Sequence, residues 1–297
     1  QTNNMVAIFY LMLGMGLLSA MDAIAKLMLD QDYAVVQTLA VRSWIIIVAM
    51  TAWIMTRPGG LTKLKTKRVK LHSVRVVIGF CAPFFFFTSL GEMPLADVTV
   101  LFFASPFIMT ALSVPLFGEK VGVHRWISIA IGFVGVIIIV QPGATTFQFA
   151  AIYALIGCAA YSLIGLMVRW MSDTESSLVI VYYFNLGVGL IASVALPFYW
   201  IPVPVEHFWM FGAMAVLALT GHICMTRAFT LGEMGTITPF EYSSLIWAVL
   251  LGYLLWGDLP AAHVWFGTVI IVGCGLYILY RENRKNAEIT PPVSDIP

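Results

Sequence analysis

Charged side chains are scarce in this sequence. Asp, Glu, Lys and Arg make up only 10% of its 297 residues, whereas an average soluble domain has about 25%. Hydrophobic residues make up 60%, and the mean hydropathy is +0.92. A water-soluble fold of this composition would have too few polar residues to cover its surface, so most of that surface must face a lipid bilayer. The formal net charge of +1 gives no reason to expect a nucleic-acid partner.

Cysteine is also rare, and motifs for catalysis or metal binding are missing. The four cysteines lie in separate apolar stretches without CxxC spacing, which argues against a disulfide framework and a zinc site. The sequence contains no HExxH, GxSxG or Walker segment. We therefore expect neither an enzyme nor a bound cofactor, and no self-contained ATP-driven pump.

Apolar stretches near the roughly 20-residue length of a bilayer-spanning helix recur along the chain. Short connections with Gly and Pro separate them. The sequence thus predicts an all-α integral membrane protein with a disordered, polar tail at 282–297. The ten predicted transmembrane helices lie near 5–29, 36–56, 71–91, 97–117, 123–141, 148–171, 177–200, 208–231, 237–256 and 263–281.

Basic residues concentrate in one connection, which predicts the orientation of the chain. Seven of the sixteen Lys and Arg residues lie at or near the connection between the second and third spans, at Arg57, Lys63, Lys65, Lys67, Arg68, Lys70 and Arg75. Connections rich in Lys and Arg remain in the cytoplasm. Counting spans from this connection predicts that both termini are cytoplasmic.

The two halves of the sequence match each other. Leu90-Gly91-Glu92-Met93 recurs as Leu231-Gly232-Glu233-Met234, and other matches follow in the same order. They pair Ser105 with Ser244, Gly118-Glu119 with Gly257-Asp258, Trp126 with Trp265, Ser19 with Ser162 and Lys26 with Arg169.

A duplicated unit of five spans has a consequence for topology. Because five is an odd number, the second copy must cross the membrane in the opposite sense, which puts the two GEM turns on opposite faces. We predict two inverted five-helix repeats, 1–143 and 144–281. Inverted repeats of this kind hold a substrate site near the bilayer midplane that opens to each side in turn. A duplicated scaffold without a transport role is the alternative.

Further residues extend the pattern around these matches. They are the segment from Leu90 to Asp97, Ser105-Pro106, Gly118-Glu119, Arg125-Trp126, Gly132-Phe133-Val134-Gly135 and Gln141-Pro142-Gly143. Together with the ten-helix arrangement, they make the chain resemble the EamA-type transporters of the drug/metabolite transporter superfamily. The second half departs from the pattern, because Gly235 stands where the first half has Pro94, and no proline matches Pro106.

The resemblance implies a secondary transporter of small metabolites, with amino-acid export as its nearest expectation. It also implies the inner membrane of a bacterium as the location. Organic cations and sugar derivatives are alternative substrates, and an intramembrane enzyme or a receptor is an alternative function.

Ionisable side chains within a span are costly unless they face a cavity or a partner. Arg227 and Glu241 each lie seven residues from Met234, so they lie at equal depth in an antiparallel hairpin. We expect them either to pair or to face an aqueous cavity. His222 is a neutral candidate for the same cavity or for a helix contact.

A second set of ionisable residues lies near the outer membrane face. Asp22 and Arg42 are each ten residues from Asp32, and Lys26 follows Asp22 by one helical turn. Asp22 is therefore expected to pair with Arg42 or with Lys26, in a structural or gating role.

Aromatic residues suggest the chemistry of the substrate site. Phe102 and Phe103 occupy the positions that Glu241 and Tyr242 occupy in the other half. A cavity between the halves would have an aromatic wall and an acidic wall, which suits a zwitterion or an organic cation. Further polar edges are expected from Tyr161, Asn185 and Trp247. Ordinary helix packing is the alternative for each aromatic residue.

Two small-residue features concern helix geometry. Pro106 and Pro239 lie inside spans, where each removes a helix hydrogen bond, and we predict them to be hinges. Gly132 and Gly135 permit close helix approach. The sequence leaves open whether such contacts lie within the chain or in a homodimer.

Overall fold

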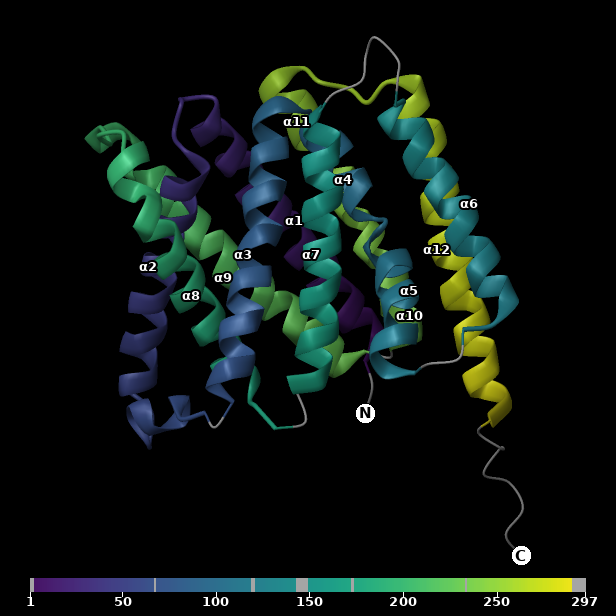
Figure 1. The fold of residues 1–297 in the computed structure, drawn as a ribbon, viewed down its shortest axis with the longest axis horizontal. Helices are drawn as coiled ribbons and strands as arrows, with labels where there is room; N and C mark the ends of the chain where they lie inside the picture. Colours follow the sequence, from purple (N-terminus) through teal and green to yellow (C-terminus); the bar gives the residue numbers. More distant parts are fainter. Residues whose placement is uncertain are drawn as a thin grey trace, which may run out of the picture.

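The computed structural model describes residues 3–66, 68–118, 121–142, 149–171, 174–232 and 234–289, and these residues form helices joined by short connections (Figure 1). The α-helices are α1 (Asn4–Leu29), α2 (Val35–Met55), α3 (Val69–Glu92), α4 (Leu95–Phe102), α5 (Ser105–Phe117), α6 (Val123–Val140), α7 (Phe149–Met171), α8 (Ser177–Tyr199), α9 (Phe208–Leu231), α10 (Met234–Ile237), α11 (Ser243–Trp256) and α12 (Ala262–Ile289). The 3-10 helices are η1 (Gly60–Leu64), η2 (Val205–His207) and η3 (Thr238–Tyr242). The predicted features that lie outside the described residues are Lys67, Glu119, Gly143, Glu233 and the tail from 290 to 297.

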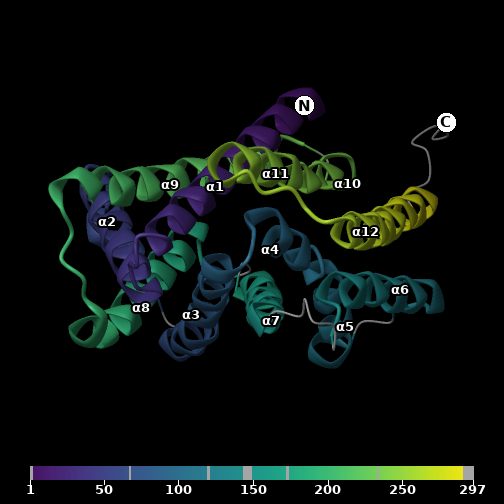
Figure 2. The same ribbon diagram turned by 90° about the horizontal axis from the view of Figure 1, so that it is seen from above.

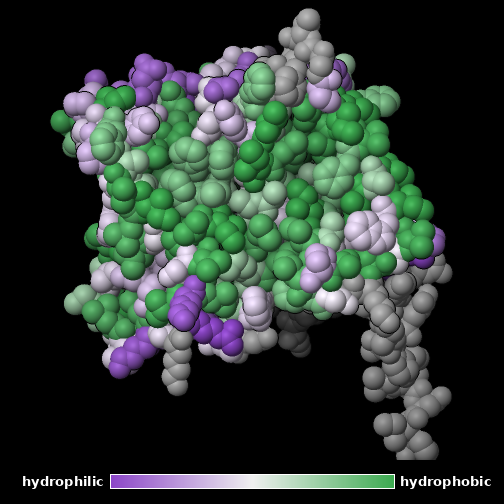
Figure 3. Space-filling view, viewed as in Figure 1, coloured by the Kyte–Doolittle hydropathy of each residue, from purple (hydrophilic) through white to green (hydrophobic). Residues whose placement is uncertain are grey.

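Within the described ranges, nine helical segments are long and apolar enough to cross a membrane. They correspond to nine of the ten predicted spans. The remaining one, 237–256, is divided among the end of α10, η3 and the 14-residue helix α11. Figure 3 shows a broad apolar band between more polar ends, as expected of a surface that lipid surrounds. The predicted ten-helix membrane fold is confirmed.

The bundle has two distinct ends. The N-terminus, the connection between α2 and α3 and the end of α12 lie together at the bottom of Figure 1. We call this the basic end, because Arg57, Lys63, Lys65 and Arg68 lie there. The opposite end, where α1 and α3 finish, is the distal end.

The two copies of the GEM turn lie at opposite ends of the bundle. Near the C-terminal end of α1, the Lys26 ammonium donates hydrogen bonds to the carbonyl oxygens of Leu90 and Met93, at 2.8 and 2.9 Å. Just before α1, the Asn3 N–H donates to the carbonyl oxygen of Leu231 at 3.0 Å. At 1.5 Å per residue these contacts are roughly 35 Å apart along α1, somewhat more than the hydrocarbon thickness of a bilayer. The inverted repeat requires this separation.

Helices of one half pack against helices of the other. α1 packs along α9, and α7, the corresponding helix of the second half, packs along α3 (Figure 2). α2 pairs with α8, and α6 pairs with α12. Each of these contacts joins the two halves, so the repeats form one interlocked bundle.

Glycines allow these helices to approach closely. A Cβ atom on Gly14 of α1 would lie 3.1 Å from the carbonyl oxygen of Gly221 on α9. A Cβ atom on Gly157 of α7 would lie 3.2 Å from an α3 carbonyl oxygen. Gly135 of α6 similarly faces the carbonyl oxygen of Gly267 on α12, at 3.0 Å. The predicted close approach at Gly135 is therefore confirmed as a contact within the chain.

The fourth and ninth spans are interrupted at corresponding positions. α4 ends at Phe102 and α5 begins at Ser105, while η3 precedes α11 in the second half. Pro106 is the second residue of α5, and Pro239 is the second residue of η3. At the start of a helix the missing proline N–H breaks no helical bond. Both prolines thus lie directly at the interruptions, and their function as hinges stays a prediction.

The last helix is longer than expected. α12 continues to Ile289, so the predicted start of a disordered tail at 282 is corrected. Residues 282–289 include Glu, Arg, Lys and Ala, which favour helix, and the first proline beyond them is Pro291.

Candidate functional site

A cavity of about 330 Å³ lies where the two interrupted spans face each other. Its walls come from α1, α3, α4 and α5 of the first half and from α7, η3, α11 and α12 of the second. A volume of this size matches the small-molecule sites of proteins, which begin at about 300 Å³.

A repeated pair of serine contacts places this cavity on the pseudo-twofold axis. Ser19 Oγ donates to the carbonyl oxygen of Ser244 at 3.4 Å, and Ser162 Oγ donates to the carbonyl oxygen of Ser105 at 3.2 Å. In the repeat Ser19 corresponds to Ser162, and Ser105 corresponds to Ser244. The two hydrogen bonds are therefore equivalent contacts that the repeat relates to each other. Three of these serines line the cavity.

Two carboxyl groups line the cavity, one from each half. Asp22 belongs to α1 and Glu241 to η3, and both side chains are half-buried. Among the described residues that line the cavity, none is basic. In a medium of low dielectric constant, these carboxylates would attract a cationic group strongly. The sequence assigned Glu241 to the substrate site and Asp22 to gating, and the structure places both on the same cavity.

Aromatic side chains share the cavity with Glu241. The rings of Phe103 and Tyr242 meet edge to face, with centroids 4.9 Å apart. Phe86 and Phe102 do the same at 4.8 Å. The lining aromatic residues are Phe86, Phe102, Phe103, Tyr161 and Tyr242. Aromatic faces beside a carboxylate bind ammonium groups. Of the five aromatic residues that the sequence assigned to the site, the structure therefore brings together all but Trp247.

Glycine at position 275 makes room for one of these rings. A Cβ atom on Gly275 would collide with the Tyr242 hydroxyl group. Gly275 also lines the cavity. The absence of a side chain on α12 at this point therefore allows Tyr242 to take its place in the wall.

Arg42 lies behind Asp22, in the protein interior. Its side chain is only 8% exposed, and its guanidinium group interacts electrostatically with Asp22. Nη1 contacts Met21 Sδ at 3.7 Å, and the guanidinium carbon lies 5.6 Å from the centroid of the Phe87 ring. Of the two predicted partners of Asp22, the structure thus supports Arg42.

Lys26, the alternative partner of Asp22, makes different contacts. Its ammonium group binds the carbonyl oxygens of Leu90 and Met93 at the end of α3. The last carbonyl groups of a helix lack helical partners. The Lys26 ammonium group therefore donates to these carbonyl oxygens rather than to the carboxylate of Asp22, one helical turn away.

Four residues that the sequence assigned to the substrate site do not line the cavity. One of them, Asn185, is buried on α8, where its side-chain amide donates to the carbonyl oxygen of Val181 at 3.0 Å. Arg227 and His222 lie at exposed positions on α9. Trp247 instead packs on α1, where a Cβ atom on Gly16 would lie 3.0 Å from its ring. Equal depth of Arg227 and Glu241 does not make their side chains face each other, and η3 interrupts the expected straight hairpin. The expected pairing of Arg227 with Glu241 is not found among the described residues.

Hydroxyl side chains of the cavity wall were missed by sequence reasoning. Thr99, Thr110 and Thr238 line the cavity. Threonine is common in membrane helices, and its spacing here carries no signal. Ser19 could have been found, because the repeat already matched it with Ser162.

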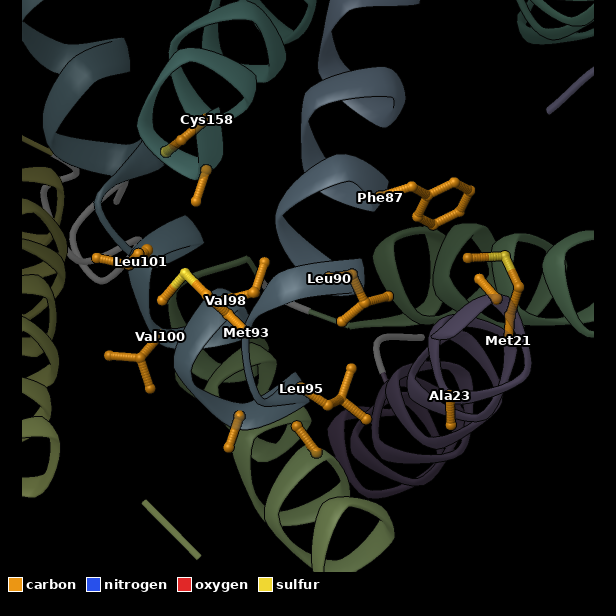
Figure 4. Close-up of a cluster of buried hydrophobic side chains, with 14 of the residues drawn as sticks. Met21, Ala23, Phe87, Leu90, Met93, Leu95, Val98, Val100, Leu101 and Cys158 are labelled. Atoms are coloured by element: carbon orange, nitrogen blue, oxygen red, sulfur yellow. The ribbon is translucent and has the colours of Figure 1, made fainter. Parts of the chain in front are cut away.

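Apolar side chains close the distal end of the cavity. Leu90, Leu95 and Val98 are fully buried there, and Figure 4 shows them gathered at the junction of α3 and α4. Toward the basic end the cavity continues to Thr110 and Leu279. The structure is therefore a conformation whose distal side is closed.

Comparison with known proteins gives a consistent result. The EamA-like transporter family matches residues 5–141 and 148–281, once in each half. A riboflavin transporter of Rhizobium johnstonii is 26% identical over 233 residues, which cover 76% of this chain and 75% of that protein. An S-adenosylmethionine uptake transporter of Rickettsia bellii is 24% identical, with 76% and 77% covered. A pseudopaline exporter of Pseudomonas aeruginosa is 24% identical, with 75% and 79% covered.

A solved crystal structure shares the fold. It superposes with a TM-score of 0.62 over 94% of this chain and 99% of that one, at 17% sequence identity. The family match extends over nearly the whole length of the chain, in two copies that coincide with its two five-span halves. The chain therefore belongs to the EamA-like transporter family, whose members in these comparisons are small-molecule transporters.

Proposed function

We propose that this protein is a secondary transporter that moves a small metabolite with an amino group across the membrane by alternating access. The observation that carries the proposal is the cavity between the two inverted halves, where Glu241 lies among aromatic side chains. A positively charged amine would bind the carboxylate and the aromatic faces, and an apolar part would pack on Phe102 and Phe103.

Within this class we infer export of amino acids, the activity that the family resemblance implies. The ammonium group of an amino acid would lie beside Glu241, and its carboxylate would accept a hydrogen bond from the Thr99 hydroxyl group in place of the carbonyl oxygen of Leu95. The relatives include both uptake transporters and an exporter, so the direction of transport rests on the resemblance alone.

An organic cation is the second candidate substrate, and one observation favours it. Because no described lining residue is basic, the cavity offers a carboxylate no cationic partner. A ligand that has an amino group and no carboxylate does not require a basic residue in the cavity wall.

We also propose that the protein lies in the inner membrane of a bacterium, with the basic end in the cytoplasm. Support comes from the basic connection between α2 and α3 and from the bacterial relatives. The lipid bilayer and the transported molecule are the partners of this function. A homodimer stays a prediction.

Flux into proteoliposomes tests the proposal. Purified protein would be reconstituted and offered radiolabelled amino acids, quaternary ammonium compounds and a sugar. We expect saturable, stereoselective flux of an amino acid. Saturable flux of the quaternary ammonium compound alone would replace the amino acid with the organic cation. Flux that does not saturate for any compound would contradict a carrier.

A further inference from the structure

We propose that Lys26 is a latch that holds the distal end of the substrate cavity closed, and that its release opens this end. The inference rests on the alternating access proposed above. It adds the residue on which the change of access depends.

The first set of contacts in the latch is a pair of hydrogen bonds. Lys26 lies one helical turn beyond the cavity residue Asp22, on the distal side, and is 7% exposed. Its ammonium group donates to the carbonyl oxygens of Leu90 and Met93 at 2.8 and 2.9 Å. Hydrogen bonds from a charged donor are the stronger kind. They tie α1 to the turn that connects α3 with α4.

The second set of contacts in the latch involves residues of the other repeat. The same ammonium group lies 5.5 Å from the centroid of the Trp256 ring, at the end of α11. Nε1 of Trp256 donates a hydrogen bond of 2.7 Å to a carboxylate oxygen of Asp30, just after α1. Asp30 and Asp258 also interact electrostatically with Lys26. One cation therefore holds α1, the α3–α4 turn and α11 together.

The position of these contacts explains why they control access. α4 and α11 belong to the two interrupted spans that form the cavity walls. The fully buried side chains of Leu90 and Leu95 lie beside the latch at the distal end. Separating the two spans at this end requires Lys26 to leave either the carbonyl oxygens or the Trp256 ring. The latch thus stabilises the conformation seen here over one that is open at the distal end.

Distances across the distal end test this proposal without reference to transport. Spin labels would be attached at Glu92→Cys and Leu259→Cys, two exposed positions at the ends of α3 and α11, with the four native cysteines replaced by alanine. Pulsed electron paramagnetic resonance spectroscopy of the protein in lipid nanodiscs would give the distribution of distances between the two labels. We expect Lys26→Met to raise the population of long distances about twofold or more, because the closed state loses its specific contacts.

Matched variants control for general damage. Lys26→Arg keeps the charge and the donors and should preserve the short distance. Lys63→Met, which removes an exposed lysine at the basic end, should leave the distribution unchanged. Trp256→Leu removes the contacts of the Trp256 ring with Lys26 and Asp30 and leaves Lys26 in place. This variant tests the latch if the Lys26→Met protein fails to fold.

The outcomes separate this inference from the proposed function. An unchanged distribution in a folded Lys26→Met or Trp256→Leu protein overturns the latch, even if the wild-type protein transports. Longer distances in these variants support the latch, and absence of wild-type flux in the same preparation would then count against the transport proposal alone.

Discussion

The two carboxyl groups of the cavity, Asp22 and Glu241, differ in their basic neighbours. Asp22 has the buried guanidinium group of Arg42 behind it, and the two groups interact electrostatically. Glu241 has no basic neighbour among the described residues that line the cavity. At the scale of single residues, the charge available to a ligand is therefore that of Glu241.

Replacement of Glu241 by glutamine tests this difference. Removing one charge-assisted hydrogen bond costs about 1.5–3 kcal/mol, so we expect the substrate Kd to rise about 10- to 100-fold. Binding to the purified protein would be measured by calorimetry. Glu206→Gln is the control, because Glu206 is an exposed residue of η2 at the distal end. Equal affinities for wild-type protein and Glu241→Gln would remove Glu241 from the site.

The Asp22–Arg42 interaction gives a prediction about stability. Removing one member leaves the other charge without its partner, which costs more than removing both. In a cycle of Asp22→Asn, Arg42→Met and the double variant, we expect a coupling of about 1–3 kcal/mol. Thermal denaturation in detergent would measure it. Strictly additive losses would show that the two groups do not interact.

Gly275 offers a way to change the cavity through a single methyl group. Gly275→Ala should displace Tyr242, because the added Cβ atom would occupy the position of its hydroxyl group. We expect weaker substrate binding and a folded protein, measured by calorimetry and by melting. Gly273→Ala is the matched control on the same helix, since no atom lies within 4 Å of an added Cβ there. Similar effects of both substitutions would argue against a role for Tyr242.

At the scale of helices, the repeat determines which elements touch. Gly14 on α1 and Gly157 on α7 occupy corresponding positions, and each allows close contact with a helix of the other half. The closest atoms in both contacts are backbone atoms, which cannot move aside as a side chain can.

Overpacking of one of these contacts should destabilise the bundle. We expect Gly14→Leu to lower the free energy of unfolding by about 1–3 kcal/mol, the usual cost of extra atoms in a packed core. Gly212→Leu on α9 should have little effect, because no atom lies within 4 Å of an added Cβ. Melting temperatures of the two variants would be compared, and equal values would contradict the close packing of α1 on α9.

The sequence predicted these elements well where periodicity and repetition decide the structure. Span number, the inverted halves and the opposed GEM turns follow from hydropathy and from the self-match. The interruption between α10 and α11 could not be read from hydropathy, because both sides of it are apolar, although Pro239 lies there.

Side-chain partners were harder to predict than elements. The spacing of Asp22 and Lys26 permits a pair on one helix face, but the carbonyl oxygens that Lys26 binds come from residues more than 60 positions away. Arg227 and Glu241 were matched by depth alone, and depth does not determine which way a side chain faces. The aromatic wall was predictable, because the repeat placed Phe102 and Phe103 opposite Glu241 and Tyr242.

For the whole molecule, the cavity where the two interrupted spans meet is closed at the distal end and continues toward the basic end. An inverted repeat has two nearly equivalent arrangements, and exchanging them would move the opening from one side of the membrane to the other. The pair of equivalent serine contacts shows that corresponding residues of the two halves meet in the same way.

Counterflow in proteoliposomes is the most direct measurement of this account. Vesicles loaded with unlabelled substrate would be diluted into a trace of labelled substrate, without an ion gradient. A carrier that exposes one site to each side in turn should accumulate label transiently above its equilibrium level. Label that only rises to equilibrium, at a rate proportional to concentration, would indicate an open pathway and contradict alternating access.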